Sequence, residues 1–183
     1  MVAAALPAQP ATDYADLADR LGRYARTAMD QDAPGLLDLT DPALFEIIPR
    51  ELLQQQYAAL SSTDRISFEV KNYVVEEIGE VVHHGDTDYA PVRCRHQLIC
   101  QPVAADFENS SVRHRLLRLL QKNFGSDNVR TDEQRGLLLV EVEKTLFAIR
   151  RGDNDWYFFE YRNDTAGLLD LVLPPAVRER VMD

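Results

Sequence analysis

One imidazole lies among apolar residues in a strand-like segment, and it is the first side chain to consider for chemistry. In the segment APVRCRHQLIC, alternate positions carry Ala90, Val92, Cys94, His96, Leu98 and Cys100. Because successive side chains of a strand point to opposite faces, His96 shares its face with apolar residues. A buried imidazole without a partner costs about 1 to 3 kcal/mol, so a side chain, a backbone group, water or a ligand must bond it. A histidine satisfied inside the core is the commoner outcome, and an acid or base in a pocket is the alternative.

A carboxylate among aromatic residues is the second candidate. In DWYFFEY, Glu160 shares a strand face with Trp156 and Phe158. A carboxyl group beside two large rings resembles a desolvated acid, although a glutamate at a sheet edge or paired with an arginine is the commoner case. An enzyme built from these residues would be a small-molecule isomerase or lyase that uses His96 with Glu160.

No other grouping predicts a metal site or a nucleophile. His83 and His84 are consecutive, so in a strand they point to opposite faces and do not easily ligate one ion with Asp86 and Asp88. A solvated turn is the favoured interpretation of this stretch. The chain has no glycine-rich phosphate loop, and we expect neither a metal nor a cofactor.

The two cysteines of the chain are expected to be small buried hydrophobes. Cys94 and Cys100 are six residues apart, or about 20 Å along one strand, which is too far for a disulfide between them. They also lack the CxxC spacing and the ordered histidine and acid that a catalytic thiol needs.

Composition restricts the class of partner. The 183 residues suit one domain, and a hydrophobic content of 45% with 27% charged residues is typical of globular proteins. The formal charge of −10 repels phosphate backbones, so nucleic acid is not an expected partner. No apolar run reaches the 18 or so residues that span a bilayer, and we expect no membrane association.

The N-terminus decides the expected location. Residues 1–12 are predicted to be a flexible tail, because MVAAALPAQPA has neither a basic region nor a long apolar region. The default expectation is a cytoplasmic protein. If the true start lies upstream, these residues would be the end of an export signal.

Hydrophobic spacing divides the rest of the chain into helices and strands. Spacings of three and four predict helices over 13–30, 50–61 and 111–123, with Gly125 as a left-handed C-cap of the third. Prolines break the stretch between the first two helices into short turns. A last helix is expected after Pro174 and Pro175.

A period of two begins at Ile66 and predicts the strands. Residues 66–74 and 89–101 are expected to pair antiparallel, and 137–149 should form a hairpin with 155–161. This order of elements indicates an α+β fold in which an antiparallel sheet packs against helices on one face.

With these elements the chain resembles the nuclear transport factor 2-like (NTF2-like) superfamily, in particular bacterial members whose function is uncharacterised. The resemblance covers 13–162 and rests on the long first helix, the second helix PRELLQQQYAAL, the hairpin and the closing strand DNDWYFFEY. It implies a cone in which a curved antiparallel sheet wraps around the N-terminal helices, within one domain over 13–183. The helix at 111–123 departs from the simplest form of this fold.

The resemblance implies a cavity but not a reaction. Members of the superfamily include isomerases, dehydratases and cyclases as well as proteins that bind ligands or dimerise, and fold does not choose among them. The catalytic residues of the steroid isomerases do not map onto this chain. We expect a non-catalytic domain that binds a small apolar ligand or forms a homodimer. The dimer hypothesis rests on DWYFFEY, which has large apolar side chains on both strand faces that need covering. The expected pocket residues are His96, Cys94, Trp156 and Glu160.

Overall fold

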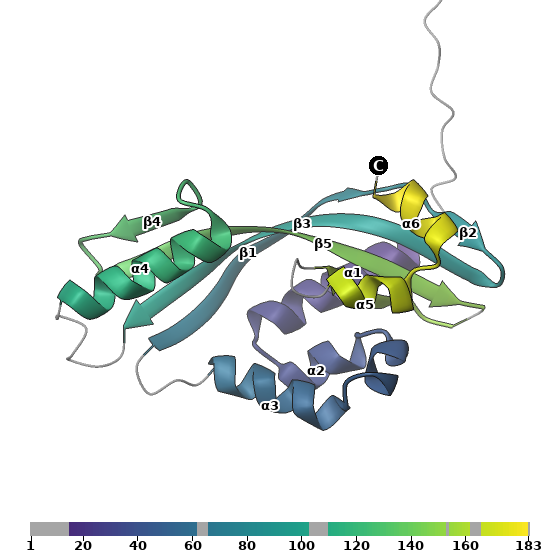
Figure 1. The fold of residues 1–183 in the computed structure, drawn as a ribbon, viewed down its shortest axis with the longest axis horizontal. Helices are drawn as coiled ribbons and strands as arrows, with labels where there is room; N and C mark the ends of the chain where they lie inside the picture. The colour runs from purple at the N-terminus through teal and green to yellow at the C-terminus, as the bar shows by residue number, and fades with distance from the viewer. Residues whose placement is uncertain (1–14, 62–65, 103–109, 153, 162–165, 183) are drawn as a thin grey trace, which may run out of the picture.

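The computed structural model describes residues 15–61, 66–102, 110–152, 154–161 and 166–182. The predicted tail at 1–12 lies outside these residues. Figure 1 shows a curved sheet that runs the length of the molecule, with helices grouped at several positions along it. The helices are α1 (Ala15–Met29), α2 (Ala33–Asp38), the 3-10 helix η1 (Pro42–Glu46), α3 (Arg50–Ser61), α4 (Ser110–Phe124), α5 (Ala166–Val172) and α6 (Pro175–Val181).

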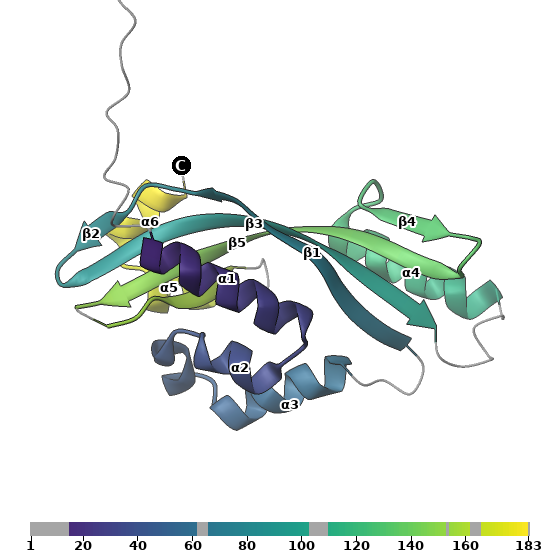
Figure 2. The same ribbon diagram turned by 180° about the vertical axis from the view of Figure 1, so that it is seen from behind.

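The six described strands form one antiparallel sheet with the central order β1-β3-β5-β4. β2 pairs with the start of β3. β4 pairs with the beginning of β5, and β6 pairs with the later part of β5 that β4 does not reach. The sheet is not closed into a barrel (Figure 2). Its strands are β1 (Ile66–Ile78), β2 (Val82–His84), β3 (Thr87–Pro102), β4 (Val129–Asp132), β5 (Leu137–Arg151) and β6 (Tyr157–Tyr161).

The predicted α+β architecture is confirmed, and three strands differ from the prediction. β1 continues past residue 74 to Ile78. The prediction stopped short because register shifts between Lys71 and Val74, and again before Glu77, interrupt the alternation of side chains. Asn72 has a φ of 54°, in the left-handed region, at the first shift. β2 and β4 were not predicted as strands, and β2 falls where a solvated turn was favoured, since three or four residues beside polar turns carry too weak an alternation.

Prolines and aspartates form the short helices between α1 and α3. Pro34 and Pro42 lie in the first turns of α2 and η1, where a missing N–H costs nothing. Asp32 and Asp41 cap these two helices by accepting hydrogen bonds from backbone N–H groups of the first turn. Residues 39–41 then run beside β6, where Thr40 forms a parallel bridge with Phe158.

The sheet buries the predicted apolar face of β3 against α1. The even-numbered residues Ala90, Val92 and Cys94 are at most 1% exposed and pack with Leu17 and Leu21 of α1. Further along the same face, Cys100 packs with α4. The N-terminal helices and α4 therefore cover two ends of one sheet face.

The C-terminal helices cover the opposite sheet face. Phe159 packs with Leu169, Leu173 and Val177 of the α5–α6 segment, while Phe158 packs on the α1 side. Both phenylalanines are 2% exposed. The apolar side chains on the two faces of β6, which motivated the dimer hypothesis, are thus covered within one chain. Helices lie on both faces rather than on one.

Gly125 ends α4 as predicted. Its φ is +90°, and its N–H donates to the carbonyl of Gln121. We expect Gly125→Ala to lower the free energy of unfolding by about 1 kcal/mol, because a Cβ is strained in this conformation. Gly167→Ala is the matched control: its Cβ would meet open space in α5 and should leave stability unchanged or slightly raised. Urea unfolding checks both, and equal effects of the two substitutions would contradict this account.

Candidate functional site

A cavity of about 460 Å³ lies over the α1 side of the sheet, between the N-terminal helices and α4. Its floor comes from β1, β3, β5 and β6. The lining residues are Tyr24, Ala28, Gln31, Ala33, Leu36, Tyr57, Phe68, Val70, Tyr73, His96, Leu98, Leu116, Leu119, Leu120, Asn123, Phe124, Lys144 and Glu160. Most of these side chains are aliphatic or aromatic, and the described part of the lining carries one cation and one carboxylate.

His96 is buried in this floor. It is 8% exposed and its ring stacks in parallel on Tyr73, with centroids 5.4 Å apart. Burial, and then the nearby Lys144 ammonium, lower the pKa of His96 to about 4, so the imidazole is neutral at pH 7. Its Nδ1 atom is buried and has no hydrogen-bond partner among the described residues.

Lys144 and Glu160 form an ion pair beside His96. The Lys144 Nζ atom lies 2.8 Å from Glu160 Oε2, and the lysine side chain is 11% exposed. The Tyr24 hydroxyl donates a 3.3 Å hydrogen bond to the same carboxylate oxygen. Burial, and then the Glu160 charge, raise the pKa of Tyr24 well above its usual value, so this hydroxyl keeps its proton.

Two aromatic rings enclose the Lys144 ammonium. Its Nζ atom lies 5.4 Å from the ring centroids of both Tyr24 and Tyr73. Ring faces attract cations, so these contacts act on the ammonium together with Glu160. The ammonium is therefore held by groups of the protein itself.

The four predicted pocket residues have different positions. His96 and Glu160 both line the cavity, but Glu160 bonds Lys144 and Tyr24 instead of the imidazole. Cys94 is 1% exposed and lies in the core beside Tyr73, outside the lining. Trp156 is 2% exposed and also lies outside the lining, in a separate polar network.

Lys144 was not predicted as a site residue, although the sequence carries a pattern that could have identified it. The even positions of β5 carry Leu138, Val140, Val142, Lys144, Leu146 and Ala148. Lys144 is a charged residue within this apolar row of β5, just as His96 is a polar residue within the apolar row of β3. β3 and β5 pair Cys94 with Lys144 and His96 with Val142, so the two polar residues are diagonal neighbours.

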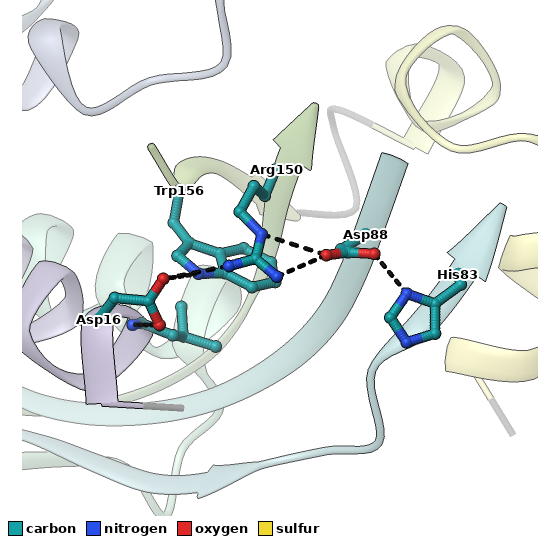
Figure 3. Close-up of polar contacts among 6 residues, drawn as sticks. Asp16, His83, Asp88, Arg150 and Trp156 are labelled. Carbon is teal, nitrogen blue, oxygen red and sulfur yellow. Dashed lines mark hydrogen bonds and ion pairs between the residues drawn. The ribbon is translucent and has the colours of Figure 1, made fainter. Parts of the chain in front are cut away.

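The second polar network ties α1 to the sheet (Figure 3). Arg150 lies between two carboxylates, with its Nη2 atom 2.7 Å from Asp88 and its Nη1 atom 3.1 Å from Asp16. Its guanidinium stacks over the Trp156 ring, whose Nε1 donates to Asp16. His83 bonds Asp88 from the other side. Burial favours a higher pKa for Asp88, but the hydrogen bonds from Arg150 and His83 outweigh it and lower that pKa.

The two consecutive histidines lie in a short strand beside a tight turn. His83 and His84 belong to the short strand β2, and the turn that follows is Gly85 and Asp86. Within the described residues, no three side chains of histidine, cysteine, aspartate or glutamate are grouped so that they could hold a metal ion. None of the described helices is both long and apolar enough to cross a membrane.

Comparisons with known proteins find similarity to solved structures, at a low level. No family model matches the chain, and no curated protein sequence matches it. A crystal structure from Streptomyces avermitilis, described as "a putative dehydratase from the NTF2-like family", is similar with a TM-score of 0.39 and 16% identity. The match covers 81% of this chain and 93% of that one. It names the family that the sequence resembles, and at this level of similarity it supports no conclusion about substrate or reaction.

Proposed function

We propose that this protein binds one small, largely apolar molecule in the cavity between α1 and α4. The observation that carries the proposal is the cavity itself, about 460 Å³ in volume, with an apolar lining and polar groups gathered on one side at His96, Lys144 and Glu160. Cavities of roughly 300 to 1,000 Å³ with a few convergent polar groups are typical of small-molecule sites.

Binding is favoured over acid–base catalysis by the state of the two candidate residues. A general base works best when its pKa is near the working pH, and a pKa of about 4 makes His96 a weak base at pH 7. Glu160 is already engaged by Lys144 and Tyr24. An isomerase or lyase that used His96 with Glu160 would have to break this arrangement first.

Ligand binding is also favoured over dimerisation through β6. Phe158 and Phe159 are both buried by elements of the same chain, so no apolar face of β6 needs a second copy. The cavity, in contrast, has unfilled apolar volume beside buried polar groups.

Filling the cavity should abolish binding of an apolar probe. We expect the uncharged dye N-phenyl-1-naphthylamine to bind with one-to-one stoichiometry, and Ala28→Phe to weaken that binding at least about tenfold by occupying the cavity. Fluorescence titration measures both affinities.

The control for this titration introduces the same ring elsewhere. Ala176 is exposed on α6, on the opposite side of the sheet, and Ala176→Phe should leave dye binding unchanged. If the dye does not bind the wild-type protein, or binds the Ala28→Phe protein equally well, the proposed function is wrong.

A further inference from the structure

The charges that line the cavity compensate one another. Lys144 and Glu160 are the charged side chains of the described lining, and they lie 2.8 Å apart. His96 is neutral at pH 7 because its pKa is lowered to about 4. The cavity therefore presents a net charge near zero, although the chain as a whole carries a formal charge of −10.

Each member of the ion pair is held by several protein groups. The Lys144 ammonium contacts Glu160 and the rings of Tyr24 and Tyr73, while Glu160 also accepts the Tyr24 hydroxyl. A ligand carboxylate would have to compete with Glu160 for the ammonium and lie close to a like charge. A ligand ammonium would meet Lys144 in the same way. Either charge would lose its water without gaining a counter-charge of its own.

Uncharged polar groups are what the cavity offers instead. His96 Nδ1 is buried without a partner among the described residues, on a side chain that is 92% buried and lines the cavity. A neutral imidazole has one donor and one acceptor nitrogen, and the tautomer decides which of these roles Nδ1 takes. A hydroxyl group suits both roles, and a carbonyl oxygen suits the donor role. One such oxygen in a ligand would bond the imidazole where its ring lines the cavity.

We propose that the cavity selects uncharged, largely apolar molecules that carry one hydroxyl or carbonyl oxygen near His96, and that the Lys144–Glu160 pair excludes the matching carboxylates and amines. This inference rests on the proposed function, because it specifies the ligand class of the same cavity. It assigns the ion pair a role in specificity.

A series of probes with one apolar body tests the selection. 2-Naphthylmethanol, 2-acetonaphthone, 2-naphthoate and 2-naphthylmethylamine compete for the protein against N-phenyl-1-naphthylamine at pH 7.5. We expect the alcohol and the ketone to displace the dye at concentrations at least about tenfold lower than the carboxylate or the amine requires.

Removing one charge of the pair should change the preference in a defined direction. Glu160→Gln leaves the Lys144 ammonium without its carboxylate, so 2-naphthoate should bind this variant at least about tenfold more tightly than wild type. Lys144→Met should produce the same gain for the amine. Glu143→Gln is the matched control, because Glu143 is exposed in β5 outside the lining.

The outcomes separate this inference from the proposed function. If the dye does not bind, the proposed function fails, and this inference fails with it. If the dye binds but the carboxylate or the amine displaces it as well as the alcohol does, only the inference is overturned. It is also overturned if Glu160→Gln melts like wild type and does not gain affinity for the carboxylate. The wild-type series decides the matter by itself should a variant not fold.

Discussion

Replacing Arg151 with methionine should lower the free energy of unfolding by about 3 to 5 kcal/mol. The Arg151 guanidinium bonds both oxygens of Asp41, at 2.6 Å and 2.9 Å, and Asp41 is 0% exposed. Without the arginine, a fully buried carboxylate keeps one hydrogen bond, from the Ala43 N–H, and loses its counter-charge. Urea unfolding at pH 7 measures the loss.

Two further variants locate the cause of this loss. Asp41→Asn in the Arg151→Met protein should recover part of the stability, because the amide removes the unpaired buried charge. Arg135→Met should change stability by less than about 0.5 kcal/mol, since Arg135 is 78% exposed and lies 3.9 Å from Asp132. A loss below about 1 kcal/mol for Arg151→Met would contradict the role given to this ion pair.

Acidification should destabilise the protein through His96. The folded pKa of His96 is about 4 and the unfolded value is about 6.5, so between these values the unfolded chain binds a proton that the folded chain does not. This contribution to stability is complete above pH 6.5 and is lost as the pH falls toward 4. The stability lost between pH values above 6.5 and pH 4 amounts to about 3 kcal/mol.

The comparison with His96→Gln isolates this contribution from those of the carboxylates. Glutamine does not titrate, so the variant should lose less stability between pH 6.5 and pH 4 than wild type by about 3 kcal/mol. The exposed His84 in β2 supplies the control, and His84→Gln should follow the wild-type curve. Parallel curves for wild type and His96→Gln would show that the imidazole is not desolvated as described.

The cavity side of β3 is an example of what alternation predicts well. A period of two places His96 on the same strand face as Cys94 and Leu98, because the alternation of side chains along a strand does not depend on tertiary contacts. The strand and the buried position of His96 were predicted for that reason. β4 was missed because three of its four residues, Arg130, Thr131 and Asp132, are polar, so the segment shows no alternation, although it forms a hairpin with the adjacent β5.

The partners of the site residues depend on register and could not be predicted. Glu160 lies beside Lys144 because β5 pairs Leu146 with Glu160, and Tyr24 reaches the same carboxylate from α1, 136 residues away. Trp156 shares its strand face with Glu160 in the sequence, yet it packs with Arg150 and Asp16 instead of lining the cavity.

The sequence by itself determined the longer helices and strands, the apolar faces of those strands and the presence of one imidazole on such a face, since all of these follow from local periodicity. Tertiary structure decided that helices cover both sheet faces, that the N-terminal helices and α4 leave a cavity between them, and that Lys144 neutralises Glu160 inside it. The physical reason is that a cavity and an ion pair each need groups from distant segments, whose distances depend on how the sheet curves and how its strands are paired.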